Sequence, residues 1–202
     1  MSDHYFSSSP VSKSFIRVIE HEWRGVKIRF ETDNGTFSKT EVDQGSRILM
    51  DALPEEIRGN VLDLGCGWGA VGVTVGKRYP DAGITMCDVN ERALALAGSN
   101  AEKNGVKAET VLSDGLSNVE GSFDLIITNP PIRAGKQVIY RLFEESRDQL
   151  SENGCLYMVI RKQQGAESAI KYLKTLFGSV KTVDKSAGFW VIRCEQNESE
   201  GA

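Results

Sequence analysis

The chain has 202 residues, of which 40% are hydrophobic and 26% are charged, and its formal net charge at pH 7 is −4. This length and composition predict one domain with a substantial core, and no stretch is long and apolar enough to cross a bilayer. The first residues lack the basic start and apolar core of a secretory signal, so we expect a cytoplasmic protein. With four widely spaced cysteines and two histidines, neither disulfides nor a metal site is predicted.

The amino-terminal part of the chain is expected to form a hairpin ahead of the main domain. Residues 1–14 are rich in serine and are predicted to lack a fixed structure. Short alternating runs at 15–19 and 26–31 flank Arg24-Gly25, which indicates an antiparallel hairpin. Residues 42–52 follow as a predicted helix, so the hairpin and its loop fill residues 15–40.

Apolar runs and helical patterns then alternate, which is typical of a parallel sheet. Predicted strands lie at 60–64, 83–88, 108–112, 123–128 and 155–160. Predicted helices lie at 69–78, 91–103, 136–151 and 166–177. Two last strands, 180–183 and 189–192, flank a turn and form a hairpin. We therefore predict an α/β, Rossmann-like domain over residues 15–195: a seven-stranded, mostly parallel sheet with an antiparallel carboxyl-terminal hairpin, followed by an acidic tail at 196–202.

The first strand of this sheet runs into the glycine-rich turn Val61-Leu-Asp-Leu-Gly-Cys-Gly-Trp-Gly69. Alternate glycines leave room for a cofactor against bare backbone. In the dinucleotide-binding fingerprint GxGxxG, the third glycine comes one residue later. The N-terminus of the following helix then points at the anionic pyrophosphate. The Asp63 carboxylate suits the ammonium side of S-adenosylmethionine better. A tight turn without a ligand would explain the glycines and leave Asp63 unexplained.

Two later strands also end in acids. Asp88 is placed to accept both ribose hydroxyls, and Asp114 is placed for an adenine amine. Any nucleotide cofactor would use an acid such as Asp88, which therefore supports a ribose without identifying the cofactor. The predicted S-adenosylmethionine-binding residues are Phe37, Asp63, Gly65, Cys66, Gly67, Gly69, Asp88, Val89, Asp114, Gly115 and Asn129.

The strand at 123–128 delivers Asn129-Pro-Pro-Ile132 to the edge where open α/β sheets bind ligands. Two consecutive prolines stiffen this loop and lack amide hydrogens. The Asn129 side-chain oxygen and the Pro130 carbonyl can accept both hydrogens of a planar amine and draw its nitrogen toward a nucleophilic geometry. We therefore predict Asn129, Pro130, Pro131 and Ile132 as catalytic residues acting on a base amine or a glutamine amide. A rigid loop that only ends a strand is the alternative.

With these motifs the chain resembles the small-domain family of methyltransferases that includes the 16S ribosomal RNA guanine-N2 enzymes, in particular its single-domain bacterial members. The resemblance rests on Asp33-Asn-Gly-Thr-Phe-Ser38, Asp43-Gln-Gly-Ser-Arg47, Asp63 to Gly69, Asp88 and Asn129 to Lys136. Two positions depart from the family pattern. Ile132 stands where an aromatic often stacks on the target base, and Arg133 stands where the longer guanine enzymes tend to have histidine.

The resemblance implies an S-adenosylmethionine-dependent methyltransferase (EC 2.1.1.-) acting on ribosomal RNA or the small ribosomal subunit, most specifically on guanine N2. Adenine-N6 and protein glutamine-N5 methyltransferases, and a noncatalytic RNA-binding assembly factor, remain alternatives. The negative net charge disfavours RNA, but residues 195–200 alone contain three acids. The predicted substrate-binding residues are Arg133, Lys136 and Arg161, with Arg141 and Lys162 as further phosphate contacts.

Three aromatic residues can be assigned either to the site or to the core. Phe37, with Ser38 and Lys39 beside it, is predicted either to cover the cofactor or the base or simply to pack. Trp68 lies within the glycine turn and is a candidate wall of the cofactor pocket, whereas Trp190 in a strand is predicted to be core.

Overall fold

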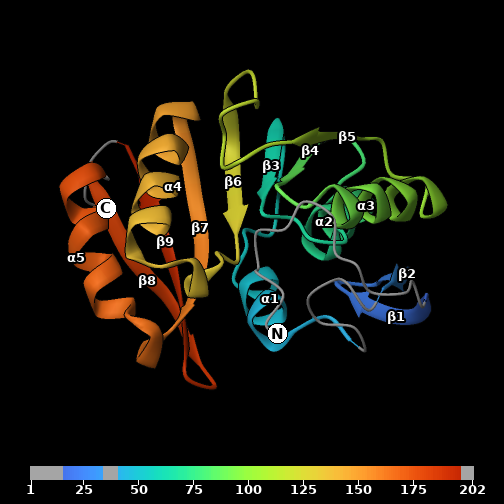
Figure 1. Cartoon of the computed structure of the whole chain (residues 1–202), viewed down its shortest axis with the longest axis horizontal. Helices are drawn as coiled ribbons and strands as arrows, with labels where there is room; N and C mark the ends of the chain where they lie inside the picture. Colours follow the sequence, from blue (N-terminus) through green and yellow to red (C-terminus); the bar gives the residue numbers. More distant parts are fainter. Residues whose placement is uncertain (1–15, 34–40, 197–202) are drawn as a thin grey trace, which may run out of the picture.

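The computed structural model describes residues 16–33 and 41–196. Its centre is a seven-stranded sheet with the order β5-β4-β3-β6-β7-β9-β8 (Figure 1). The parallel strands are β3 (Asn60–Leu64), β4 (Gly83–Asp88), β5 (Ala108–Leu112), β6 (Phe123–Thr128) and β7 (Leu150–Arg161). Strand β9 (Phe189–Glu195) runs antiparallel to both β7 and β8 (Ser179–Ser186). The predicted Rossmann-like sheet with its antiparallel hairpin is confirmed.

Helices cover both faces of this sheet, which explains why its strands are almost continuously apolar. On one face lie α1 (Gln44–Asp51), α2 (Ala70–Arg78) and α3 (Glu91–Lys103), and on the other lie α4 (Lys136–Gln149) and α5 (Ala166–Leu176). Neighbouring strand residues divide between the two cores: Val61 packs with the first set of helices and Leu62 with the second. Alternation along a strand therefore decides which helix layer each side chain meets.

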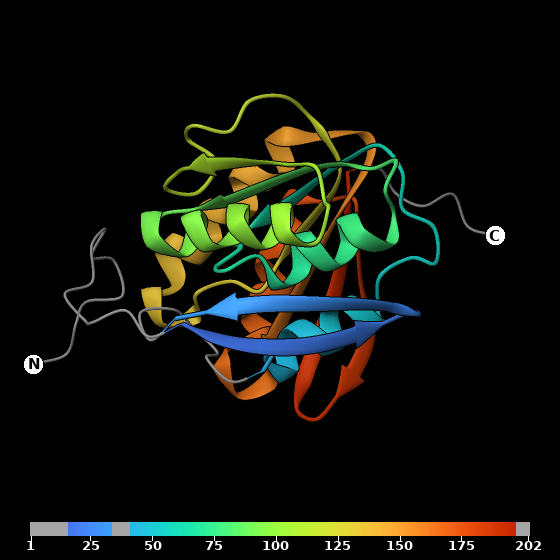
Figure 2. The same cartoon turned by 90° about the vertical axis from the view of Figure 1, so that its right-hand side faces the viewer.

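The amino-terminal hairpin forms a separate two-stranded sheet of β1 (Arg17–Trp23) and β2 (Val26–Thr32). It lies beside α2 and α3 (Figure 2). Arg24 and Gly25 both have positive φ, 44° and 79°, as a two-residue hairpin turn requires. The predicted turn is therefore confirmed, although β1 reaches the turn and does not stop at residue 19.

Asn100 of α3 and Asn104, the C-cap residue of this helix, attach the hairpin to the main domain. The backbone N–H of Glu31 donates to Asn100 Oδ1 (2.8 Å), and Asn100 Nδ2 donates to the Glu31 carbonyl (2.9 Å). Asn104, one helical turn later, makes the same pair of bonds with the backbone of Arg29 (3.2 and 2.9 Å). Asn100 Nδ2 also donates to the Trp68 carbonyl (2.9 Å). The hairpin is thereby joined to the helix that follows the ribose-binding candidate Asp88.

Several predicted boundaries were wrong by a few residues. The helix predicted at 42–52 begins at Gln44, because the Asp43 side chain accepts from the Ser46 N–H and caps it. Strand β7 begins at Leu150, so the helix predicted to 151 ends at Gln149. Gln196, predicted to open the tail, donates to the Arg147 carbonyl (2.8 Å). The predictions for residues 1–14, for 197–202 and for Phe37, Ser38 and Lys39 lie outside the described residues.

No helix within the described parts of the chain has both the length and the apolar character needed to cross a bilayer.

Candidate active site

The candidate site lies where the order of the sheet reverses. From β3 the chain moves outward to β4 and β5, then crosses back to β6 on the other side of β3. Ligands of open α/β sheets bind at the carboxyl ends of the strands at such a point. A pocket is found there, lined by Leu64, Gly65, Cys87, Asp88, Val89, Ser113, Asp114, Gly115, Asn129, Pro131, Val138 and Leu142. The fold thus brings the cofactor candidates Gly65, Asp88 and Asp114 together with the catalytic candidate Asn129.

The glycine turn is anchored to the end of β4. The backbone N–H groups of Gly65 and Cys66 both donate to the Cys87 carbonyl (2.9 Å each), and the Gly67 N–H donates to Asp88 Oδ2 (2.8 Å). Gly65 and Gly67 have φ values of +73° and +55°, and a Cβ at either position would meet no atom within 4 Å. Their backbone therefore offers an open surface for a ligand, as predicted from the spacing.

Two other residues of the turn serve packing. A Cβ at Gly69 would lie 3.1 Å from the Cα of Ala97, so this glycine allows α3 to approach the turn. Cys66 is buried in the hydrophobic core, and neither residue lines the pocket. Trp68, predicted as a pocket wall, is also buried and packs edge-on against Phe30, with ring centroids 4.9 Å apart. The structure thus places the backbone of Gly69 against α3 and the side chains of Cys66 and Trp68 in the core.

Asp88 lies in the pocket with both carboxylate oxygens bonded to backbone. Oδ1 accepts from the Asn90 N–H (2.8 Å) and Oδ2 from the Gly67 N–H (2.8 Å). Each oxygen keeps a second lone pair, so the carboxylate can still accept two hydroxyl groups. Burial raises the pKa of Asp88, and the backbone hydrogen bonds oppose that shift. This geometry fits the predicted ribose contact.

Asp63 occupies a different position from the one predicted. Its side chain is 3% exposed, does not line the pocket, and accepts from the Gly72 N–H in the first turn of α2 (2.7 Å). Asp63 lies two residues after Val61 on β3, so its side chain points to the same face of the sheet, toward α2. Burial raises the pKa of Asp63 to about 7, and nearby Asp88 adds to the shift. Its clearest role is to bind the helix behind the glycine turn.

This pKa gives a stability prediction. Unfolded Asp63 titrates near its ordinary value of 3.8, and folded Asp63 titrates near 7. Between these values the folded state holds a proton that the unfolded state has released, so the free energy of unfolding should fall as pH rises from about 4 to about 7. Asp63→Asn keeps an acceptor for Gly72 and should remove this decline. Urea denaturation at a series of pH values measures it.

The test compares the pH dependence of the free energy of unfolding of Asp63→Asn with that of wild type, because other groups also titrate between about pH 4 and 7. Burial lowers the pKa of His21, which contributes with the opposite sign, and Asp88 contributes with the same sign as Asp63. Both groups are present in wild type and variant. Asp81→Asn, at an exposed site before β4, is the matched control and should follow wild type. Parallel profiles for wild type and Asp63→Asn would contradict the assignment.

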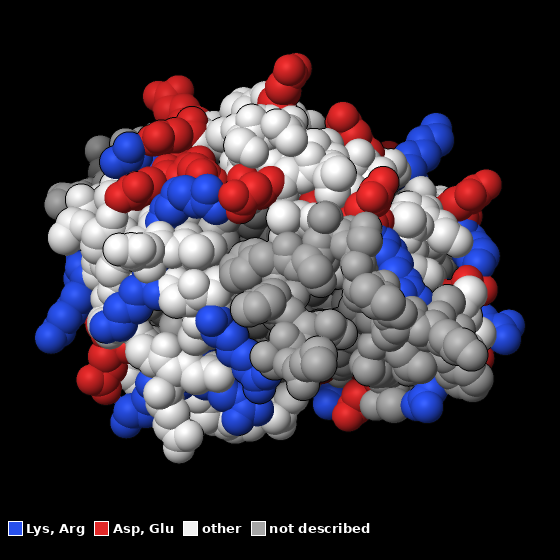
Figure 3. Space-filling model, viewed as in Figure 1, with Lys and Arg blue, Asp and Glu red and all other residues white. Residues whose placement is uncertain are grey.

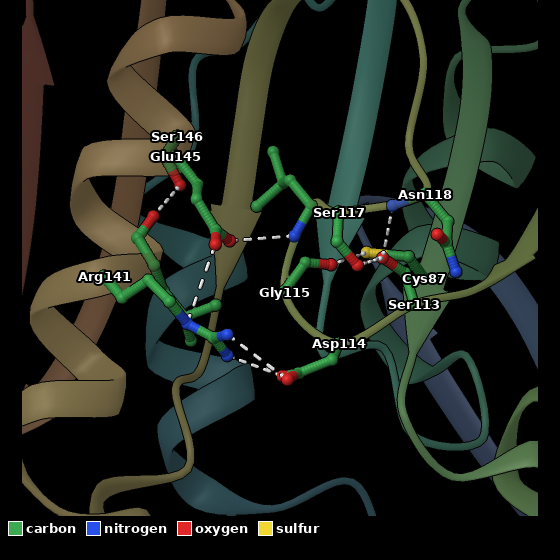
Figure 4. Close-up of polar contacts among 11 residues, drawn as sticks. Cys87, Ser113, Asp114, Gly115, Ser117, Asn118, Arg141, Glu145 and Ser146 are labelled. Carbon is green, nitrogen blue, oxygen red and sulfur yellow. Dashed lines mark hydrogen bonds and ion pairs between the residues drawn. The ribbon is translucent and has the colours of Figure 1, made fainter.

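Asp114 faces the same pocket but is paired with a cation of α4 (Figure 4). Arg141 donates to both its carboxylate oxygens, at 2.5 and 3.2 Å, and lies 3.6 Å from Glu145. Glu145 in turn accepts from the Leu116 N–H (2.9 Å), which fixes the turn after Asp114. Asp114 retains exposed carboxylate surface for an adenine amine. Arg141, however, is paired with two acids, which disfavours its predicted role as a phosphate contact.

The Asn-Pro-Pro loop is held from several sides. Thr128 Oγ1 donates to the Leu64 carbonyl (2.9 Å), which ties the end of β6 to the end of β3. Asn129 Nδ2 donates to Asp43 Oδ1 and to Ser46 Oγ, both at 3.1 Å. A carboxylate only accepts, so the amide nitrogen faces Asp43 and the amide oxygen remains for another donor. That oxygen is the acceptor predicted for a substrate amine.

The Pro130 carbonyl, the second predicted acceptor for the amine, already accepts one hydrogen bond within the loop. The Pro130 carbonyl accepts from the Ile132 N–H (2.9 Å), and the Pro131 carbonyl accepts from the Ala134 N–H (2.8 Å). These bonds shape the short 3₁₀ turn η1 (Ile132–Ala134). One lone pair of Pro130 remains, so the loop offers one free amide oxygen and one shared carbonyl.

Exposed cations lie along the carboxyl ends of β6 and β7. Arg133 in η1 and Lys136 at the start of α4 are exposed. Arg161 lies 4.4 Å above the Phe189 ring. Lys and Arg side chains gather in the lower left of Figure 3, on the side toward which β6 points in Figure 1, while acids dominate the upper part. The predicted substrate residues therefore share one edge of the domain.

Trp190 belongs to this edge as well. It packs against the core beneath α4 and α5, as predicted, but it is only partly buried, and Lys185 and Lys162 lie 4.4 and 5.9 Å from its ring centroid.

Sequence reasoning missed the roles of five residues at the site. Val138 and Leu142 lie on the apolar stripe of their helix, which by itself indicates core packing, and both line the pocket. Ser113 lines it too, from the end of β5. Asp43 and Ser46 were noted only within the resemblance, because nothing local links them to a loop more than 80 residues away.

Comparison with known proteins places this site in a family. The model of the methyltransferase small domain matches residues 27–193. The chain is 44% identical to the uncharacterized protein YbxB of Bacillus subtilis (strain 168), over 97% of this chain and 100% of that protein. It is 31% identical to ribosomal RNA small subunit methyltransferase C of Pseudoalteromonas atlantica, over 89% of this chain and 52% of that protein.

A solved structure gives the same result. The T. thermophilus 16S rRNA N2 methyltransferase RsmC, in complex with AdoMet and guanosine, aligns with a TM-score of 0.81 at 26% identity, over 94% of this chain and 52% of that chain. This chain thus spans about half the length of either named ribosomal RNA enzyme. The sheet, its glycine turn and its Asn-Pro-Pro loop define an S-adenosylmethionine-dependent methyltransferase. The chain belongs to the methyltransferase small domain family.

Proposed function

We propose that the chain is a cytoplasmic N-methyltransferase of ribosomal RNA whose target is the exocyclic N2 amine of a guanine. The observation that carries the proposal is the Asn129 amide, whose nitrogen is bonded to Asp43 and Ser46 and whose oxygen is left to accept from an amine beside the cofactor pocket. The names of two similar proteins, a ribosomal RNA small subunit methyltransferase C and a 16S rRNA N2 methyltransferase, support the choice of substrate.

The pocket residues fit S-adenosylmethionine. The open backbone of Gly65, which lines the pocket, and of its neighbour Gly67 would hold the methionine end, Asp88 would accept from the ribose, and Asp114 would accept from the adenine amine. When bound, S-adenosylmethionine supplies an activated, electrophilic methyl group.

The residues of the chain then prepare the nucleophile. The Asn129 oxygen and the remaining lone pair of Pro130 accept hydrogens from the amine, which favours a nitrogen with its lone pair directed at the pocket. The loop thereby lowers the free energy needed to bring the amine nitrogen into its nucleophilic geometry. The proton leaves the alkylated nitrogen late, to water or to an oxygen of the loop, so no histidine or other strong base is required beside it.

Mass mapping of modified nucleosides tests the proposal directly. Purified protein is incubated with labelled S-adenosylmethionine and with small-subunit RNA, assembled small subunits or a glutamine-containing protein fraction. Labelled N2-methylguanosine in RNA is the expected product. Labelled N6-methyladenosine or N5-methylglutamine would instead assign one of the alternative substrates, and binding without any transfer would point to an assembly factor.

Exposed cations at the catalytic edge give a second expectation. If Arg133 and Lys136 bind phosphates, RNA affinity should fall steeply with salt, and Arg133→Ala/Lys136→Ala should reduce the slope of log K against log salt by about 0.7–0.9 for each lost contact. Filter binding at a series of salt concentrations measures the slope. Affinity for S-adenosylhomocysteine should not change.

The control removes the same charge from the opposite edge. Arg58 and Lys107 are exposed and precede β3 and β5, at the amino ends of these strands. Arg58→Ala/Lys107→Ala should leave the slope at its wild-type value. Equal slopes for the two double variants would mean that Arg133 and Lys136 form only a solvated surface.

A further inference from the structure

The first turn of α1 contacts the catalytic loop although 83 to 86 residues separate them in the chain. Asp43 is the N-cap residue of α1, and its Oδ1 accepts both from the Ser46 N–H (3.2 Å) and from Asn129 Nδ2 (3.1 Å). Ser46 Oγ lies 3.1 Å from the same amide nitrogen. A single helix terminus therefore receives both donors of the Asn129 side chain.

This arrangement matters because an asparagine amide has two nearly isosteric ends. Rotation by half a turn would exchange the oxygen for an NH₂ group, which cannot accept from a substrate amine. The half-buried Asp43 carboxylate accepts only, and it would face the amide oxygen after such a rotation. The rotated state therefore loses the hydrogen bond to Asp43 and places two acceptors in contact, while the Ser46 hydroxyl can bond either end of the amide.

The close approach of α1 depends on Gly45. A Cβ at this position would lie 3.0 Å from a Phe189 ring carbon, 3.1 Å from Asp43 Oδ1 and 3.4 Å from Asn129 Nδ2. The rest of the helix is fixed against the sheet by Leu49 and Met50, which are fully buried. The helix terminus is thus a rigid support and not a mobile cap.

We infer that Asp43 and Ser46 are positioning residues that hold the Asn129 amide with its oxygen toward the substrate amine. The inference rests on the proposed function and adds to it the part of the chain that orients the acceptor. It also accounts for the presence of Asp43 and Ser46 at the start of a helix whose Leu49 and Met50 pack into the core.

Two variants separate positioning from helix stability. Asp43→Ser keeps an N-cap residue, since serine also caps helices, but its shorter side chain cannot serve the cap and reach Asn129 together. Ser46→Ala removes the second acceptor and leaves the Ser46 backbone N–H in place. We expect kcat for RNA methylation to fall about 10-fold or more in Asp43→Ser and about 3- to 10-fold in Ser46→Ala. Thermal stability and the Kd for S-adenosylhomocysteine should stay near wild type.

The decisive readout is a double-mutant cycle with Asn129→Ala. Once the amide is gone, Asp43→Ser should cost less than about twofold more, because residues acting through one group are not additive. Asp43→Asn, which retains an acceptor oxygen, should recover most of the turnover. A full additional loss in the Asn129→Ala background, or wild-type kcat in both single variants, would overturn the inference. Wild-type protein that binds S-adenosylhomocysteine but methylates no RNA would overturn the proposed function instead.

Discussion

Asn129→Ala should lower the turnover number for RNA methylation by about 100-fold or more, with the Kd for S-adenosylhomocysteine within about threefold of wild type. The amide oxygen accepts from the amine as its nitrogen becomes nucleophilic, so its loss acts on the transition state more than on cofactor binding. Single-turnover methylation and calorimetry measure the two quantities separately.

Two companion variants sharpen this test. Asn153→Ala changes an exposed asparagine near the amino end of β7 and should be neutral. Asn129→Asp keeps acceptor oxygens but loses both donors and sets a second carboxylate against Asp43, so it should be impaired as well. Turnover of Asn129→Ala within a few-fold of wild type would remove the side chain from the catalytic role.

Asp88→Ala should weaken S-adenosylhomocysteine binding by about 1.5–3 kcal/mol, which corresponds to roughly 10- to 150-fold in Kd. The carboxylate can accept from the ribose while it holds the Gly67 and Asn90 N–H groups, so the variant loses a ligand contact and loosens the glycine turn. Calorimetry at constant pH measures the loss. Affinity for NAD should be undetectable in wild type and variant.

The pH dependence of S-adenosylhomocysteine binding gives an independent test of the role of Asp88. Burial raises the pKa of Asp88, and a protonated carboxyl offers fewer lone pairs to hydroxyl groups, so affinity should decrease as pH falls. Asp88→Ala should respond less to pH than wild type does. Asp81→Ala, at the amino end of the same strand, should match wild type in affinity and in pH profile. An unchanged Kd for Asp88→Ala would exclude Asp88 from the cofactor site.

Sequence patterns were most informative where local chemistry decides the structure. Continuous apolar runs predicted strands covered on both faces, and Arg24-Gly25 predicted a turn that needs two positive φ values. The spacing of Gly65 and Gly67 predicted an open backbone surface, which the structure contains. Each of these features depends on residues close together in the chain.

The missed features depend on which way a side chain points or on what a distant segment supplies. An acid at a strand end can face a ligand or a helix. Asp63 faces Gly72 because it points to the same face of the sheet as Val61, two residues before it. The partners of Asn129 and of Asp114 lie 86 and 27 residues away. No periodicity or motif spacing encodes such pairs, so the neutralised Arg141 and the amide support at Asp43 emerged only from the tertiary structure.

Asn100 of α3 and its C-cap residue Asn104 also close an edge of the hairpin. Residues four apart on a helix are separated by about 6 Å along its axis, close to the roughly 6.6 Å between alternate residues of a strand. Asn100 and Asn104 therefore match Glu31 and Arg29 and pair with both the N–H and the C=O of each. An uncovered strand edge is a template for addition of a foreign strand. Along this side of β2 the side-chain amides take the place of that strand, so a partner molecule cannot extend the hairpin there.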